Sequence, residues 1–257
     1  MEPMEPLVMI NQAKDLGNVM REQTKPIDRI VRNALTPIEY LSLHRVYLTG
    51  DGDSYHAAMA SEMAYKSIAK ITCEPMSAMR FLEYGADYIP TAFPNDTLVV
   101  GISASGGTQR VAQALEKANQ FKENVITMVV SGDVDGKVGQ QANRKVSVKL
   151  PDMGRSPGVR TYSASLLGLI LMAIRIGEIK DRYHQAEANA MRRELIDLAE
   201  LADATFETML ASAKEAALAL KDAEIMVFVG SGPSYGTALF SAAKVIEASG
   251  TFAMGQD

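Results

Sequence analysis

The chain carries the same short pattern twice, 180 residues apart (Gly50 against Gly230). In both copies a β-rich run is followed by Gly-x-Gly-x-Ser-Tyr and then by a helical stretch of small residues: VYLTGDGDSYHAA starts at Val46 and MVFVGSGPSYGTAL starts at Met226. A strand that passes through a glycine turn into a helix is the beginning of a βαβ unit. The repeat therefore predicts two tandem α/β units in one chain.

Between the two copies, short apolar runs alternate with helical stretches. Besides the run that begins at Val46, the runs expected to be strands are 71–73, 97–102, 124–130 and 146–150. Continuous apolar runs are typical of parallel strands that are buried on both faces. We therefore predict the α/β class, with three-layer α/β/α units that are each built on a parallel sheet.

Four segments are expected along the chain. Residues 1–44 read as an N-terminal helical segment, in which Pro26 would open a second helix. The first α/β domain would span 45–180, connecting helices would span 181–220, and the second α/β domain would begin in 221–257. Strands and helices of the first unit occupy 45–150, whereas only 32 residues follow Ile225. We therefore expect the second domain to be incomplete in this chain.

Composition excludes several classes of protein. A single cysteine and three histidines rule out a disulfide scaffold and a Cys/His zinc site. A net charge of −5 argues against a general basic surface for binding nucleic acid. The longest apolar run, 166–174, is far shorter than the about 20 residues of a membrane span, and the acidic N-terminus is unlike a signal peptide. We expect a cytoplasmic protein that binds neither nucleic acid nor membrane.

The segment SASGGT, residues 103–108, lies between a predicted buried strand and a predicted helix. Backbone N–H groups at a helix N-terminus favour an anion, and glycines let the ligand approach the backbone closely. The loop has no lysine, so it differs from a nucleotide P-loop and suits a phosphomonoester on a small molecule. The alternative is that its hydroxyl groups only cap the helix.

The first copy of the repeat places a second polar turn at the same edge of the sheet. Ligands of open α/β sheets collect at the carboxyl ends of the strands, where the hydroxyl of Ser54 could reach the same phosphate. Tyr55 stands where a dinucleotide-binding turn needs its third glycine. A nucleotide-dependent kinase or dehydrogenase is therefore not favoured.

In the second unit, SAAKVIEAS (241–249) reads as a helix on which Lys244 and Glu247 share one face. From spacing alone, this pair is a surface ion pair that contributes little to stability.

Together these motifs resemble those of the sugar isomerase (SIS) domain family, over about residues 20–257. The tandem arrangement is similar to the isomerase half of the glutamine–fructose-6-phosphate amidotransferases (glucosamine-6-phosphate synthases) and to the fructosamine-6-phosphate deglycases and phosphosugar isomerases. The resemblance implies that the phosphate of a sugar phosphate is held by Ser54, Ser103, Ser105, Gly106 and Thr108. It also places beside the sugar Gly52, Val159 and Thr161.

The same resemblance assigns catalytic roles to the helix of the second unit. Residues 241–249 correspond to the family segment GALKLKEIS, so Glu247 is the expected base and Lys244 its catalytic partner. Ala104 stands where the synthases usually have glutamine, and Phe240 replaces a glutamate. No cofactor and no metal are implied, and a homodimer is expected.

We therefore expect an isomerase or deglycase that acts on a hexose or hexosamine 6-phosphate, or its amine conjugate, through an enediol or enolamine. The alternative is a non-catalytic sugar-phosphate sensor. Glutamine-dependent transfer is not expected, because the chain has no glutaminase domain. The family's ring-opening histidine and its C-terminal lysine would lie beyond Asp257.

Overall fold

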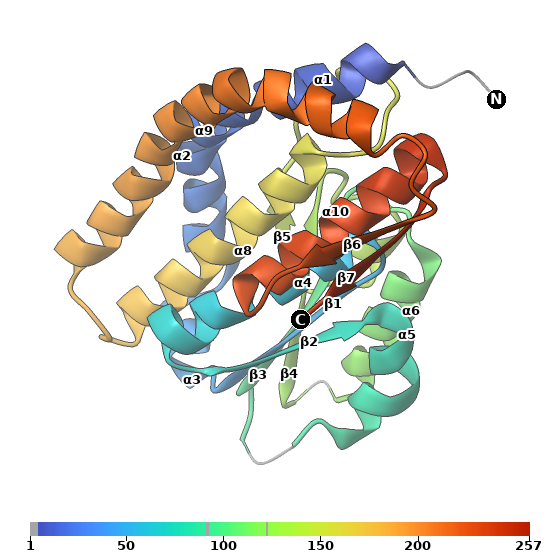
Figure 1. The fold of residues 1–257 in the computed structure, drawn as a ribbon. Helices are drawn as coiled ribbons and strands as arrows, with labels where there is room; N and C mark the ends of the chain where they lie inside the picture. Colours follow the sequence, from blue (N-terminus) through green and yellow to red (C-terminus); the bar gives the residue numbers. More distant parts are fainter. Residues whose placement is uncertain (1–4, 91–92, 122) are drawn as a thin grey trace.

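A computed structural model describes residues 5–90, 93–121 and 123–257 (Figure 1). The first four residues of the acidic N-terminal stretch lie outside these ranges. A five-stranded sheet with the order β2-β1-β3-β4-β5 forms the centre, and every neighbouring pair in it is parallel. The strands are β1 (Arg45–Gly50), β2 (Thr72–Ser77), β3 (Thr97–Ser103), β4 (Val125–Ser131) and β5 (Arg144–Ser147). The predicted α/β class and parallel sheet are confirmed.

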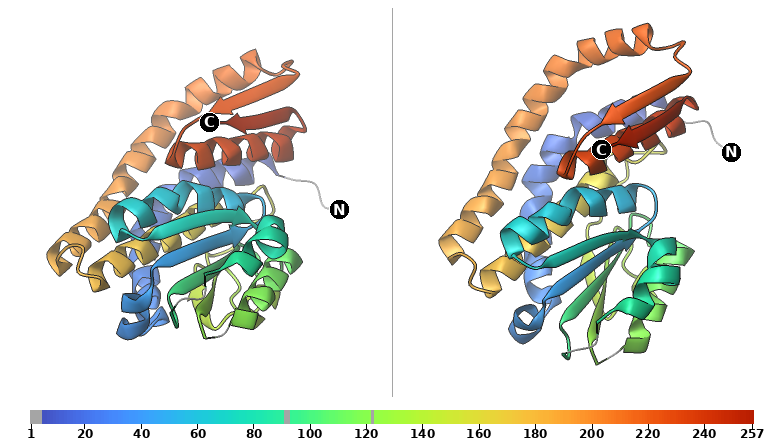
Figure 2. Two further views of the ribbon diagram at one scale, coloured as in Figure 1. Left: turned by 90° about the horizontal axis from the view of Figure 1, so that it is seen from below. Right: turned by 60° about the horizontal axis from the view of Figure 1, so that its bottom comes forward.

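Helices cover both faces of this sheet, as the views in Figure 2 show. One face packs against α2 (Leu16–Ala34), α4 (Asp53–Ala64) and α8 (Arg160–Ile179). The other face packs against α6 (Gln109–Ala118) and α5 (Ala78–Arg80). Every residue of β3 and β4 is buried, which is why their runs are apolar without alternation.

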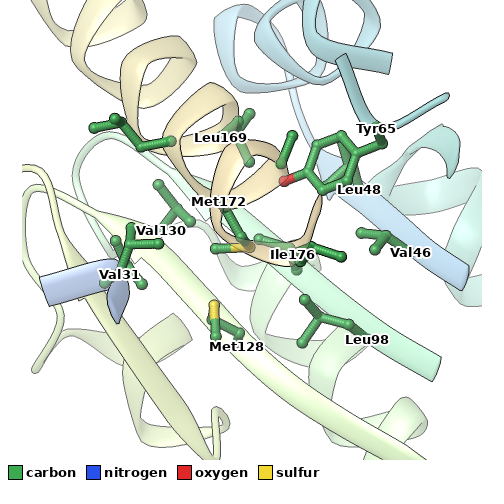
Figure 3. Close-up of a cluster of buried hydrophobic side chains, with 14 of the residues drawn as sticks. Val31, Val46, Leu48, Tyr65, Leu98, Met128, Val130, Leu169, Met172 and Ile176 are labelled. Carbon is green, nitrogen blue, oxygen red and sulfur yellow. The ribbon is translucent and has the colours of Figure 1, made fainter. Parts of the chain in front are cut away.

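The larger core lies on the face of the sheet that α8 crosses (Figure 3). Leu98 and Met128 rise from the sheet, Leu169 and Met172 descend from α8, and Val31 closes the cluster from α2. By length and apolarity α8 would be long enough to cross a membrane, but 67% of its apolar window is buried in this core. Its apolar character is therefore explained by its central position.

The N-terminal segment folds as α1 (Pro6–Lys14), α2 and α3 (Pro37–Ser42). The prediction that Pro26 opens a helix is wrong, because Pro26 lies inside α2 and the break falls at Asp15. A proline in a helix costs one backbone hydrogen bond. Here Val19, Ile27 and Val31 are buried on the same helix, and this packing outweighs the loss.

A long helix, α9 (Gln185–Ala219), leads to the second copy of the repeat. That copy folds as β6 (Ile225–Val229), α10 (Pro233–Ser249) and β7 (Phe252–Gln256), and β6 pairs with β7 in parallel. The sequence did not predict β7. Figure 2 shows α10 between this two-stranded sheet and the first unit, where it packs on α4. The remaining short helical segments are η1 (Tyr65–Ala69), η2 (Phe81–Gly85), η3 (Ala86–Tyr88), η4 (Asn119–Phe121) and α7 (Lys137–Gln140).

A buried ion cluster fixes the start of α9 to the core. Arg192 on α9 donates to Asp28 Oδ1 on α2 at 2.7 Å and to Glu178 Oε2 on α8 at 2.6 Å. Arg175 donates to the same Glu178 oxygen at 2.9 Å. Burial alone would raise the pKa of Glu178, but the hydrogen bonds from Arg192 and Arg175 lower it below its ordinary value. The cluster therefore joins three helices and sets the direction of the helix that carries the second unit.

Replacing Arg192 by leucine should lower the free energy of unfolding by about 3 kcal/mol, because the change leaves buried carboxylates without their partner. Urea denaturation at neutral pH measures this loss. Arg193→Leu is the matched control, because the neighbouring Arg193 is exposed on the same helix. Equal stability of the two variants would show that the cluster does not hold α9.

The lowered pKa of Glu178 also predicts how stability depends on pH. A carboxyl group whose pKa is lower in the folded state stabilises the fold above its ordinary pKa of about 4.3, and this contribution is lost as the pH falls through the folded value. The fall in unfolding free energy between pH 7 and pH 3.5, measured with urea, should be smaller in Glu178→Gln. Glu200→Gln, at an exposed position of α9, should keep the wild-type fall; equal falls in all three proteins would contradict the assignment.

Candidate functional site

The strand order has a switch point, the place where open parallel sheets form a ligand-binding crevice. The chain leaves β1 toward β2 on one side, and it leaves β3 toward β4 on the other, although β1 and β3 are neighbours. Ligands of open parallel sheets bind outside the carboxyl ends of the strands at such a switch point. The turn 51–53 and the loop 104–108 follow these two strands, so both predicted polar segments lie at this edge.

The loop between β3 and α6 has a conformation that requires glycine. Gly106 has a φ of +68°, and its N–H donates to the carbonyl of Ser103 at 3.2 Å. A Cβ at this position would lie only 2.1 Å from the carbonyl oxygen of Asp133. The loop is therefore held tightly against the segment that follows β4, and its course does not depend on a ligand.

The hydroxyl groups of this loop do not cap α6. Thr108 precedes the helix, but its Oγ1 lies 2.9 Å from the buried Oγ of Ser103, and no side chain caps the first turn in the described residues. Ser105 is exposed and accepts from the Gly107 N–H at 3.3 Å. The first N–H groups of an α-helix have no partner within the helix. The α6 N-terminus can therefore offer these groups, together with nearby hydroxyls, to an anion.

The two glycine turns of the repeat adopt the same conformation. Gly52 has φ +51° and ψ −127°, and Gly232 has φ +57° and ψ −128°. A Cβ on Gly50 would lie 2.8 Å from the Cβ of Ser54, and Gly230 is similarly close to the start of α10. The spacing of the glycines thus lets each helix begin directly beside its strand. In the first unit this geometry places Ser54, which is buried, in the first turn of α4.

The second unit brings its predicted catalytic pair to this turn. A Cβ on Gly236 would lie 2.4 Å from the backbone nitrogen of Ala60, so α10 and α4 cross at close range. At the other end of the contact, Lys244 Nζ donates to Asp53 Oδ2 and to Glu247 Oε2, both at 2.6 Å. Only 7% of the Lys244 side chain is exposed, against 46% for Glu247. The pair predicted to lie on the surface is therefore joined to a turn of the first unit.

Aromatic side chains and a histidine surround this ion cluster. The rings of Tyr162 and Phe240 stack with 3.9 Å between centroids, and Lys244 Nζ lies 5.3 Å from the centre of Phe240. Burial raises the pKa of the Tyr162 hydroxyl. His56 Nδ1 lies 3.8 Å from Asp53 Oδ1, and neither buried atom has a hydrogen-bond partner in the described part of the chain. The ammonium group thus lies between two carboxylates and a largely apolar wall.

Thr161 and Val159, the two remaining residues predicted to lie beside the sugar, line different cavities. Thr161 lines a cavity of about 400 Å³ together with Ala104. Val159 lines an apolar cavity of about 600 Å³ beside α1 and α9, and its N–H donates to Gln12 Oε1 at 2.9 Å. Neither cavity is lined by Glu247. Among the described residues, no group of three or more His, Cys, Asp or Glu side chains could hold a metal ion.

The sequence did not predict the roles of Asp53 and Gln12, which contact segments far away along the same chain. Gln12 lies on α1, and its side chain accepts from the backbone at the start of α8. Asp53 contacts Lys244, a residue 191 positions away. One signal could have found Asp53: the two helices of a repeat often pack together, and Asp53 opens the first while Lys244 lies on the second.

Comparisons with known proteins agree with this architecture. Residues 39–166 match the sequence profile described as SIS domain. A glutamine–fructose-6-phosphate aminotransferase (isomerizing) from Thermococcus kodakarensis is 27% identical over 216 residues, which cover 82% of this chain and 34% of that protein. The corresponding enzyme from Clostridium tetani is 23% identical over 80% of this chain and 33% of its own length. The chain thus spans about a third of the length of these curated relatives.

Solved structures with the same fold carry related names. The C-terminal domain of glucosamine-fructose-6-phosphate aminotransferase from Francisella tularensis superposes with a TM-score of 0.76 at 18% identity, over 94% of this chain and 69% of that chain. A Salmonella typhimurium protein with a proposed sugar-binding role gives 0.83 at 20% identity, over 97% and 74%. Tagatose-6-phosphate ketose/aldose isomerase from Escherichia coli gives 0.67 at 18% identity, over 95% and 65%. At these identities the likeness establishes the fold.

The open N-terminus of α6 predicts a measurable affinity for an anion. Thr108→Val removes one hydroxyl donor while it keeps the shape of the side chain, so the affinity for inorganic phosphate should fall roughly tenfold, the effect of one hydrogen bond to a charged group. Isothermal titration calorimetry measures the two dissociation constants. Thr72→Val, at an exposed position at the amino end of β2, should bind like the wild type; unchanged affinity in Thr108→Val would exclude this loop.

Proposed function

The chain belongs to the SIS domain family through residues 39–166, and from this premise we propose that it binds a sugar phosphate and shifts a proton between two neighbouring carbons of the sugar. One observation carries the proposal: Lys244 of the second unit contacts Asp53, the residue next to Ser54. Lys244 thereby connects the candidate base Glu247 to the edge of the sheet that also carries the anion loop, residues 104–108 between β3 and α6. Phosphate and reactive carbons of one small molecule could then be held at the same crevice.

Binding would begin with the phosphate group. The N–H groups at the start of α6 and the hydroxyls of Ser105 and Thr108 would donate to its oxygens, and Ser54 would add a donor from the neighbouring turn. The phosphate is remote from the carbons that react. Its binding energy would therefore serve to position the open-chain sugar and to offset the loss of freedom on binding.

Proton transfer would follow at the other end of the sugar. A carboxylate of Glu247 would remove the proton from the carbon beside the carbonyl, giving an enediol, and would return it to the neighbouring carbon, while a second proton moves between the two oxygens. In an amine conjugate the same step gives an enolamine; return of the proton to the neighbouring carbon gives an imine, and attack of water on its C=N carbon breaks the C–N bond and releases the amine. The ammonium of Lys244 would stabilise the negative charge that develops on oxygen. The proton transfer is redox-neutral, so it needs no redox cofactor.

The names of the relatives support a six-carbon substrate. The curated relatives act, by name, on fructose 6-phosphate, and two solved structures are named for tagatose 6-phosphate and glucosamine 6-phosphate. We therefore propose a hexose or hexosamine 6-phosphate, or its amine conjugate, as the substrate class, in a cytoplasmic setting. A sensor that binds the same ligand without converting it is the alternative, and turnover decides between the two.

Glu247→Gln should abolish conversion of fructose 6-phosphate, glucosamine 6-phosphate or a fructosamine 6-phosphate, because an amide cannot accept the carbon-bound proton. NMR of the substrate measures turnover, and calorimetry should show binding within about threefold of the wild type, since the phosphate contacts remain. Glu224→Gln changes an exposed glutamate of the same unit and should leave turnover intact. Conversion by Glu247→Gln would reject Glu247 as the base, and binding without conversion by the wild type would favour the sensor.

A further inference from the structure

Three charged groups form a chain whose middle member, Lys244, is the most buried. Asp53 is 22% exposed, Lys244 is 7% exposed and Glu247 is 46% exposed, and Lys244 donates to both carboxylates at 2.6 Å. The outermost member is the proposed base. The other end of the chain, Asp53, is the one carboxylate that comes from the first unit.

The backbone and the packing hold Asp53 in place. It is the first residue of α4, directly after the glycine turn, where a negative side chain is stabilised by the helix dipole. The same helix is pressed against α10 where Gly236 meets Ala60. Lys244, at the far end of this contact, thus receives a fixed partner, whereas the Glu247 side chain is half exposed and has no comparable constraint.

Stability alone does not explain this arrangement. One carboxylate would neutralise one buried ammonium, and a buried ion pair adds little to stability compared with apolar packing. Here the ammonium has two carboxylates, and Oδ1 of Asp53 and Nδ1 of His56 face each other at 3.8 Å without other partners in the described chain. Buried polar atoms without a hydrogen-bond partner are uncommon in folded proteins.

Asp53 is also joined to the phosphate end of the crevice. Ser54, the proposed phosphate donor, is the next residue along the chain and lies in the same turn of α4. We infer that Asp53 is a positioning residue: it holds the Lys244 ammonium, and through Lys244 it fixes the Glu247 carboxylate at a constant place relative to the phosphate site. This inference rests on the proposed function.

Steady-state kinetics with the sugar phosphate that the wild type converts test this role. Asp53→Asn should lower kcat by about 10- to 100-fold, the effect of a misplaced catalytic group, while KM stays within about threefold because the phosphate contacts remain. Asp53→Ser should behave in the same way and keeps a residue that favours a helix start. Asp51→Asn, which removes a charge from the same turn without a contact to Lys244, should stay within about twofold of the wild type.

A second readout does not depend on turnover. Acetylation of Lys244 by acetic anhydride, followed by mass spectrometry, should be at least about fivefold faster in Asp53→Asn, because the ammonium loses a carboxylate that stabilises its charge, and unchanged in Asp51→Asn. If the wild type converts no sugar phosphate, the proposed function fails while the lysine contact is still tested. If the wild type is active and Asp53→Asn or Asp53→Ser keeps kcat within twofold, or if Lys244 reacts equally in all proteins, the positioning role of Asp53 is overturned.

Discussion

The close crossing of α4 and α10 is the contact on which the site depends. Both helices start from equivalent glycine turns, and Gly236 allows them to approach until the backbone of one meets the other. The crossing buries Lys244 of the second unit against the turn of the first unit, where its ammonium group donates to Asp53. A side chain larger than hydrogen at position 236 would separate the helices and so move Lys244 away from Asp53.

The rest of the fold serves to hold this crossing. The buried sheet fixes where β1 and β3 end, and therefore where the turn and the anion loop meet at the switch point. The ion cluster around Arg192 fixes the start of α9, which carries the second unit back over the first. The two charge clusters thus join different elements: one joins α2, α8 and α9, and the other joins α4 of the first unit to α10 of the second.

Local patterns in the sequence were enough to predict the sheet and the loops, but contacts between distant segments were not. The continuous apolar runs of β3 and β4 predicted buried parallel strands, and the small polar residues of 103–108 predicted a loop between strand and helix, because both properties depend on neighbouring residues. Pro26 misled the prediction, since its effect on a helix was outweighed by packing that only the folded chain shows. In the sequence Asp53 resembles an ordinary turn residue. Its contact with Lys244 exists only because α10 packs on α4 in the folded chain.

We propose that a sugar phosphate binds at the ends of β1 and β3 while the half-exposed carboxylate of Glu247 moves a carbon-bound proton. Because Glu247 is 46% exposed, a proton that it carries can exchange with solvent before it returns to the sugar. The most direct measurement is NMR of fructose 6-phosphate incubated with the wild-type protein in D₂O. Deuterium should appear at the carbon beside the carbonyl group. Fructose 6-phosphate, glucosamine 6-phosphate and a fructosamine 6-phosphate that all bind, yet neither gain deuterium nor are converted, would contradict this mechanism.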